Sequence, residues 1–434
     1  MTTPTVSTAS AQLADLLGPD AVVAANQLRQ YGIGTLTPVA AVRPIDRGGV
    51  ASAMAWANRT NTAVYPSGGR TQIDLGNPAT KPGIALDLTR LNHLVDFQPA
   101  DLTITAEAGM TIEQLQSLPV PPSAAPLATG TSGPLRSTYG LPRDWLIGIS
   151  VVDPRGVQTN AGGKVVKNVT GYDLNRLYTG SLGTLAVITE ATFKIAPAPA
   201  EWSAIVGGFS GLDTTATACQ NLQAQHFAPL GLHILNRSAA QRLAALGDIE
   251  PADYIAIAII GGRPSSVQRR QKETVALWKD NAVLMRNLKG DETVALTAAL
   301  TDLPANPDAR PTISVRVNSQ PAGLRDILGM ELPVATALPP PGVVADVGFG
   351  GGRLLWWNDC SDTNAQAIAE ALQGIHAAAV ASGGSAVVER CPISVKRRLD
   401  VWGPLPSSMT VMRRLKAQFD PAGILNPGRF IGGL

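Results

Sequence analysis

A short glycine-containing turn holds the residue types best suited to binding an anion. The turn has the sequence YPSGGRT and covers residues 65–71. Its two glycines can adopt conformations in which successive N–H groups point into one concavity, and such a nest binds phosphate without a charged side chain. One arginine and two hydroxyl groups add further donors. The candidate ligands are Pro66, Ser67, Gly68, Gly69, Arg70 and Thr71. A plain hairpin turn is the alternative, because short glycine motifs often occur without function.

Two further segments combine glycines with polar side chains. Residues 130–140, GTSGPLRSTYG, permit close backbone approach to a flat ring, and an ordinary polar loop is the alternative. The candidates there are Gly130, Thr131, Ser132, Gly133, Ser137, Tyr139 and Gly140. In residues 161–189, Lys164 and Lys167 lie three positions apart. They are candidate anion ligands, and a solvated charged face is the alternative. Anion-binding segments about 100 residues apart predict one long phosphorylated cofactor, with a flavin dinucleotide as the candidate.

Several other cofactor and partner classes find no support in the sequence. The turn lacks the G-x-G-x-x-G of a dinucleotide-binding fold and the Gly-Lys-Ser/Thr of a Walker A loop. Cys219, Cys360 and Cys391 are too far apart for zinc or iron–sulfur spacing or a disulfide framework. With 35 basic and 33 acidic residues, nucleic acid is not an expected partner. No apolar stretch reaches about 18 residues and the start lacks a secretory pattern, so no transmembrane segment is expected. The expected location is the cytoplasm, with attachment to the membrane periphery through partners as the alternative.

Strands and turns must position these segments. A helix over 46–61 precedes a strand over 63–65 that runs directly into the glycine turn. Further strands are predicted over 83–88, 94–97, 102–107 and 185–195, with a hairpin over 146–160. The Ala-Pro-Ala-Pro stretch at 196–199 predicts a domain boundary. Beyond it, strands separated by helices and hairpins predict an antiparallel sheet covered by helices on one face, with no internal repeat visible.

Four motifs together resemble the vanillyl-alcohol-oxidase-type, or PCMH-type, FAD-binding family. They are PSGGRT, STYG, KVVKNVTGYDLNRLYTGSLGTLAVIT and the terminal FDPAGILNPGRF. Within that family the chain is similar to the FAD-binding subunits of bacterial glycolate oxidase complexes. The resemblance implies an α+β fold with a PCMH-type FAD-binding domain of two α/β subdomains and a ferredoxin-like antiparallel cap. The implied regions are an N-terminal part (1–34), the FAD-binding domain (35–199), the cap (200–385) and a C-terminal segment returning to the FAD domain (386–434).

The resemblance also implies roles for individual residues. Residues 66–71 would hold the FAD pyrophosphate, and residues 130–140 would line the pyrophosphate and the flavin edge. Gly183 and Ile188 would lie by the ribose and adenine, and Asn426 belongs to the returning tail. Lys164 falls in the matched run, where it either contacts FAD or shapes the loop. Covalent members carry a histidine where this chain has Arg70, so noncovalent FAD is expected.

The chain also departs from the family pattern. Residues 126–130 lack the paired glycines of the family, and Leu182 stands where an acidic residue is usual. Related 2-hydroxy-acid dehydrogenases carry a histidine-rich metal motif, whereas the comparable hairpin here, 348–354, has no histidine. The hairpin residues Arg353, Trp356 and Trp357 either face the flavin or are simply buried.

Catalytic residues therefore stay unknown from the sequence, and no metal site is expected. The resemblance implies an accessory flavin subunit working with a sister FAD subunit and an iron–sulfur subunit on a small 2-hydroxy acid. The alternatives are a self-sufficient FAD-dependent oxidoreductase and a structural subunit without cofactor.

Overall fold

The computed structural model describes residues 5–116, 127–164, 172–306, 309–320, 338–358 and 362–434. The chain divides into two compact units. The first consists of Met1–Thr131, Leu141–Pro197 and Pro404–Leu434, and the second of Ser132–Gly140 and Ala198–Gly403. The chain thus leaves the first unit beside the Pro/Ala stretch at 196–199 and returns to it after Gly403.

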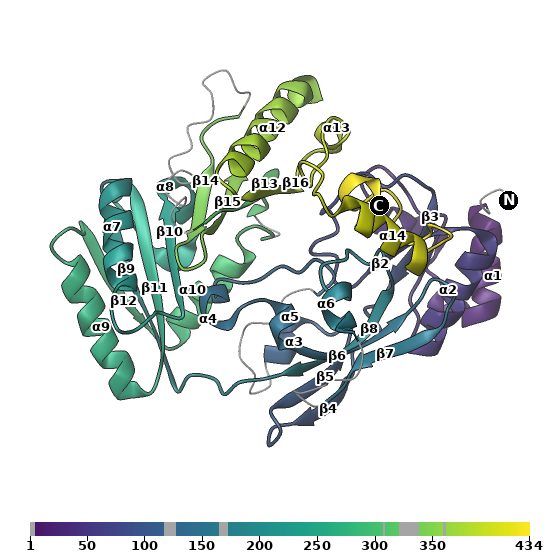
Figure 1. The fold of residues 1–434 in the computed structure, drawn as a ribbon, viewed down its shortest axis with the longest axis horizontal. Helices are drawn as coiled ribbons and strands as arrows, with labels where there is room; N and C mark the ends of the chain where they lie inside the picture. Colours follow the sequence, from purple (N-terminus) through teal and green to yellow (C-terminus); the bar gives the residue numbers. More distant parts are fainter. Residues whose placement is uncertain (1–4, 117–126, 165–171, 307–308, 321–337, 359–361) are drawn as a thin grey trace. The chain divides into compact units, whose positions relative to one another are not determined.

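A small parallel sheet forms the first half of the first unit (Figure 1). Its strands are ordered β1-β3-β2 and comprise β1 (Ala40–Val42), β2 (Ala63–Ser67) and β3 (Gly83–Asp87). Helices α1 (Val6–Leu17) and α2 (Arg47–Thr60) share a hydrophobic core with it. Asp46 caps α2, because its carboxylate accepts a 2.7 Å hydrogen bond from the Gly49 N–H. The predicted strand therefore does run into the glycine turn.

An antiparallel sheet of five strands forms the second half of the first unit, in the order β4-β5-β8-β6-β7. Its strands are β4 (Leu94–Gln98), β5 (Thr103–Glu107), β6 (Leu146–Val152), β7 (Gln158–Gly162) and β8 (Val187–Lys194). Short helices connect them, namely α3 (Ile112–Gln116), α5 (Pro142–Trp145) and α6 (Leu174–Tyr178). Val152 and Val187 reach the core that contains α1 and α2, so the two sheets share one hydrophobic interior.

The last residues of the chain extend the parallel sheet. Helix α14 (Met409–Phe419) leads into a tail, residues 420–430, in which Leu425 forms a parallel bridge with Val64 of β2. The Val64 N–H donates to the Ile424 carbonyl at 2.7 Å, and the Asn426 N–H donates to the Val64 carbonyl at 3.0 Å. The strand that carries the glycine turn is therefore completed by residues more than 350 positions away in the sequence.

Burial of Tyr65 on β2 predicts a loss of stability at high pH. Its hydroxyl donates to the Lys81 carbonyl at 2.5 Å, and burial raises its pKa from about 10 to about 12. Because the pKa of Tyr65 is higher in the folded state than in the unfolded state, its contribution to the free energy of unfolding is complete below pH 10. This contribution is lost as the pH rises towards 12. We expect this loss to reach about 2–3 kcal/mol.

Urea unfolding at pH 9 and pH 11 measures the effect. The free energy of unfolding of Tyr65→Phe should fall less between these two pH values than that of the wild-type protein. Tyr172→Phe changes a residue that is 94% exposed, and its free energy of unfolding should fall as much as that of the wild-type protein. Parallel declines in all three proteins would contradict the assignment to Tyr65.

The second unit is one antiparallel sheet of eight strands, ordered β12-β9-β11-β10-β14-β15-β13-β16. The first four strands follow the β-α-β-β-α-β connectivity of a ferredoxin-like fold. They are β9 (Glu201–Phe209), β10 (Gly231–Asn236), β11 (Tyr254–Gly262) and β12 (Leu284–Lys289), with crossover helices α7 (Leu212–Gln223) and α9 (Pro264–Trp278).

The same strand order repeats in the second half of the sheet. It contains β13 (Ile313–Asn318), β14 (Gly342–Asp346), β15 (Gly351–Trp356) and β16 (Ser385–Arg390), with helix α12 (Ala365–Ala381) before β16. Strands β10 and β14 pair and join the two halves. The unit therefore contains a doubled ferredoxin-like topology, although the sequence shows no repeat.

Helices cover both faces of this sheet, so the prediction of helices on one face only is wrong. Helices α7, α9 and α12 pack on one face in a single large core. Leu243, Leu296 and Leu300 pack on the other face, around α8 (Arg237–Ala240) and α10 (Asp291–Asp302).

The boundary predicted at residue 386 also differs from the structure. Strand β16 pairs with β13, and α13 (Ile393–Lys396) follows it, so residues 386–403 belong to the second unit. Residues 132–140, with α4 (Arg136–Tyr139), belong there too.

Candidate cofactor site

One glycine and one hydroxyl group of the turn have no neighbour or partner among the described residues. A Cβ atom built on Gly69 would meet no other atom within 4 Å. The Ser67 hydroxyl is buried and has no hydrogen-bond partner among the described residues, although its carbonyl accepts from the Leu88 N–H at 2.8 Å. A buried hydroxyl without a partner is unfavourable unless a ligand completes it. The turn therefore offers donors that the protein itself does not use.

The side chain of Arg70 fixes the turn to the end of η2 (Ala25–Tyr31), a 3₁₀ helix. Arg70 has a φ of +60°, which is uncommon for a residue with a side chain. Its guanidinium donates to the Gly32 carbonyl at 2.7 Å and lies 5.6 Å from the centroid of the Tyr31 ring. Burial lowers the pKa of Arg70, and the nearby Asp87 carboxylate opposes that shift. Arg70 therefore holds the shape of the turn with its side chain.

Residues 180–183 approach the glycine turn from the antiparallel sheet. The N–H groups of Gly180 and Leu182 donate to the Leu127 and Ala128 carbonyls at 2.9 and 2.8 Å. A Cβ atom on Gly183 would lie 3.3 Å from Asn426 Nδ2 and 3.8 Å from Pro66 Cγ. The structure thus brings Pro66, Gly183 and Asn426 together.

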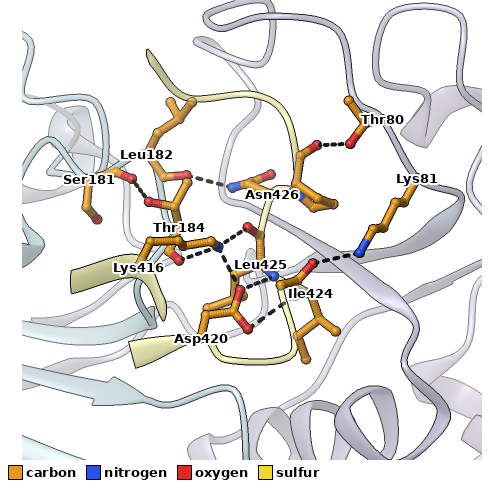
Figure 2. A network of polar contacts seen from close by, with 12 residues as sticks. Thr80, Lys81, Ser181, Leu182, Thr184, Lys416, Asp420, Ile424, Leu425 and Asn426 are labelled. Carbon is orange, nitrogen blue, oxygen red and sulfur yellow. Dashed lines mark hydrogen bonds and ion pairs between the residues drawn. The ribbon is translucent and has the colours of Figure 1, made fainter. Parts of the chain in front are cut away.

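A buried ion pair anchors the tail beside these residues (Figure 2). Lys416 Nζ donates to Asp420 Oδ2 at 2.7 Å, to the Thr184 carbonyl at 2.8 Å and to the Leu425 carbonyl at 2.9 Å. The Asp420 carboxylate also accepts from the N–H groups of Ile424 and Leu425. Burial lowers the pKa of Lys416, and the Asp420 carboxylate opposes that shift. The pair links α14, the tail and the antiparallel sheet.

Two further contacts fix the end of the tail. Asn426 Nδ2 donates to the Leu182 carbonyl at 2.6 Å, which leaves the buried Asn426 Oδ1 without a partner among the described residues. The Arg429 guanidinium donates to the Ile73 and Leu75 carbonyls at 2.5 and 2.6 Å, and burial lowers its pKa to about 10. The tail therefore joins the loop after the glycine turn to residues 182–184.

Three other predicted site residues of the first unit make contacts of their own. Lys164 is exposed and donates to Asp96 Oδ2 at 2.7 Å, while Lys167 lies outside the described residues. Ile188 is half-buried on β8 and pairs with Val151 of β6. Gly130 is close to residue 180, since its Cβ would lie 3.4 Å from the Gly180 Cα.

The predicted residues of the 130–140 segment divide between the two units. Thr131 belongs to the first unit, whereas Ser132, Gly133, Ser137, Tyr139 and Gly140 belong to the second. Within the second unit, the Ser137 hydroxyl donates to the Leu230 carbonyl at 3.3 Å, and Tyr139 packs against the apolar cluster around α10.

Sequence reasoning missed Ser181, Lys416 and Asp420. The Ser181 hydroxyl is buried without a partner among the described residues. The i,i+4 spacing of Lys416 and Asp420 on an otherwise amphipathic helix end was the available signal, but the same spacing is common on exposed helices.

The convergent residues fit a nucleotide cofactor with a pyrophosphate and several hydroxyl groups. The glycine turn supplies backbone N–H donors and the unpaired Ser67 hydroxyl for anionic oxygens. Ser181 Oγ and Asn426 Oδ1 provide polar atoms for hydroxyl or amino groups. Gly69 leaves room where a side chain would stand. Among the described residues, no group of three or more potential ligands could hold a metal ion.

Comparisons with known proteins agree with this fit. The model of the FAD binding domain matches residues 38–119, and that of the C-terminal domain of FAD linked oxidases matches residues 405–430. Both matches include parts of the convergence, namely the glycine turn and the tail.

Relatives extend over nearly the whole chain. Glycolate oxidase subunit GlcD of Bacillus subtilis is 25% identical, covering 90% of this chain and 88% of its own. A D-2-hydroxyglutarate dehydrogenase of Xanthomonas citri is 26% identical, covering 91% and 89%. Glycolate oxidase subunit GlcE of Escherichia coli is 36% identical over a shorter region, 32% of this chain and 43% of its own. The structure of p-cresol methylhydroxylase has a TM-score of 0.76 at 17% identity, covering 98% and 96%.

The fold and the two family matches define a flavoprotein oxidoreductase that binds FAD. The chain is similar to FAD-linked oxidases in both matched regions, and its fold is that of the PCMH-type FAD-binding proteins. In the part of the chain that the structure describes, no helix is both long and apolar enough to cross a membrane.

Proposed function

We propose that this chain is the FAD-binding subunit of a complex that oxidises a small 2-hydroxy acid. Two glycolate oxidase subunits among its relatives support this proposal. One is similar over most of the chain, and the other is similar over about a third of the chain at a higher sequence identity. The single observation that carries the proposal is the convergence of Pro66, Gly183 and Asn426 beside unused polar atoms. The expected partners are a sister FAD subunit and an iron–sulfur subunit.

In this proposal, the chain binds and orients FAD rather than activating the substrate. FAD supplies the two-electron acceptor for oxidation of a carbon–hydrogen bond. The N–H groups of Gly68 and Gly69 and the Ser67 hydroxyl bind the pyrophosphate, and Asn426 Oδ1 accepts from the cofactor. The Lys416–Asp420 pair keeps Asn426 in place.

The chain offers few candidates for a general base. His93 is exposed and lies 2.8 Å from the Glu107 carboxylate, and His233 Nε2 lies 2.8 Å from the Pro134 carbonyl oxygen. The 348–354 hairpin contains no histidine. We infer that removal of the substrate proton depends on a partner subunit.

A second candidate is a self-sufficient FAD-dependent dehydrogenase for such acids. This candidate is favoured by a relative named D-2-hydroxyglutarate dehydrogenase, because the similarity covers about nine tenths of both chains.

Anaerobic mixing with glycolate or D-lactate separates the two candidates. If the chain is a subunit, the flavin absorbance of the isolated protein should persist and should bleach only when the sister and iron–sulfur subunits are added. Bleaching of the isolated chain would instead establish the self-sufficient enzyme. An isolated chain that takes up no FAD would contradict both.

A further inference from the structure

Arg70 ends the glycine turn in a backbone conformation that it does not favour by itself. Its φ of +60° lies in the left-handed region, which is unfavourable for a residue with a side chain. Such a conformation persists only where the surrounding structure holds it. Neither Gly68 nor Gly69 has a side chain that could hold the turn by packing. The shape of the turn therefore depends on what holds Arg70.

Two neighbouring residues at the end of η2 hold the side chain of Arg70. Its guanidinium donates to the Gly32 carbonyl at 2.7 Å, and its Cζ atom lies 5.6 Å from the centroid of the half-buried Tyr31 ring. A cation at this distance over an aromatic ring is attracted by the negative face of the ring. The end of the turn is thus held by a segment far from it in the sequence, provided that Tyr31 itself is fixed.

A buried carboxylate fixes Tyr31 to the sheet that carries the turn. Asp87 is 5% exposed and is the last residue of β3. Its Oδ2 atom accepts from the Tyr31 hydroxyl at 3.1 Å and lies 3.3 Å from Arg43 Nε. Its Oδ1 atom accepts from the Thr89 N–H at 2.8 Å. Because several groups hold the carboxylate, it gives the Tyr31 hydroxyl a rigid attachment point.

These contacts form a closed ring around the two glycines of the turn. Ser67, at the start of the turn, is the register partner of Asp87, and its carbonyl accepts from the Leu88 N–H at 2.8 Å. Asp87 accepts from Tyr31, and the Tyr31 ring contacts Arg70 at the end of the turn. Both ends of the turn are therefore connected to β3 by contacts within the protein.

We propose that Tyr31 and Asp87 are positioning residues, which hold the glycine turn in its cofactor-binding shape before FAD arrives. The inference rests on the proposed binding of the FAD pyrophosphate by this turn. The two side chains act through Arg70 and not by contact with the cofactor. A preformed turn binds without a prior ordering step, whereas a turn that is ordered in only a fraction of the molecules binds with an affinity reduced by that fraction.

The kinetics of FAD binding to the FAD-free full-length protein test this role. Stopped-flow measurement of flavin fluorescence gives the association and dissociation rate constants separately. Tyr31→Phe removes only the hydroxyl, and Tyr31→Leu also removes the ring. They should lower the association rate constant by about threefold and about tenfold, with the dissociation rate constant unchanged, because fewer molecules hold the competent shape. Ser67→Ala removes a proposed ligand and should instead mainly raise the dissociation rate constant.

A double variant shows whether Tyr31 acts through Arg70. In an Arg70→Met background, Tyr31→Leu should lower the association rate constant no further, because the contact between the two side chains is already lost. Tyr254→Phe changes a tyrosine of the second unit that is also half-buried, and it should bind FAD with wild-type rate constants.

The outcomes separate the positioning role from the assignment of the turn itself. A raised dissociation rate constant in Tyr31→Leu, or a further loss in the Arg70→Met background, would overturn the positioning role. A wild-type association rate constant in Tyr31→Phe and Tyr31→Leu, together with weakened FAD binding in Gly69→Ala, would overturn that role alone. Wild-type binding in all of these variants would also remove the turn from the proposed cofactor site.

Discussion

Replacing Lys416 with methionine should destabilise the protein by about 3–5 kcal/mol. The Asp420 side chain is fully buried, and without Lys416 its charge would have no cation beside it. The tail would also lose the bonds from Lys416 to the Thr184 and Leu425 carbonyls. The free energy of unfolding in urea, followed by circular dichroism, measures the change.

Two comparisons show whether the effect belongs to the buried pair. Arg176→Met breaks the exposed pair with Asp173 in the same unit and should change the stability by less than about 1 kcal/mol. The double variant Lys416→Met, Asp420→Asn removes the uncompensated charge and should recover part of the loss. A Lys416→Met variant as stable as Arg176→Met would show that the pair does not anchor the tail.

Replacing Gly69 with alanine should weaken FAD binding by about tenfold or more while leaving the protein itself folded. A methyl group at this position meets no atom of the described residues within 4 Å, so a bound ligand is what it would displace. Gly69 is not at positive φ, and alanine there should leave the stability of the FAD-free protein within about 1 kcal/mol of wild type. Fluorescence titration of FAD into the FAD-free protein measures the affinity.

Gly374→Ala provides the matched control. Gly374 lies in α12 of the second unit, and a Cβ atom there also meets nothing within 4 Å. This variant should bind FAD as the wild-type protein does. Equal affinities for all three proteins would remove the glycine turn from the cofactor site.

The elements of the FAD-binding unit could be predicted because local signals agree there. Asp46 marks the start of α2, and the apolar strand before Ser67 ends in glycines, so turn and helix follow from neighbouring residues. The tail could be predicted only by resemblance. Its bridge to Val64 depends on residues distant in sequence, and no local pattern indicates which strand Leu425 will join.

The doubled ferredoxin-like topology could not be read from the sequence. Both halves need only alternating apolar strands and amphipathic crossovers, and many unrelated sequences satisfy that pattern. The ion pairs of Glu389 with Arg316 and Arg353 could not be predicted for a similar reason. Arg316, Arg353 and Glu389 are isolated single charges in three strands, and only the register of β13 with β15 and β16 brings them together.

The bridge between Val64 and Leu425 also bears on the order in which the molecule is made. On the ribosome, residues 1–197 emerge long before the tail, and the whole second unit is synthesised in between. Strand β2 therefore waits with one edge unpaired until residues 424–426 have been made, and Gly183 lacks its neighbour Asn426 for the same interval. Completion of this part of the first unit therefore follows synthesis of the whole second unit.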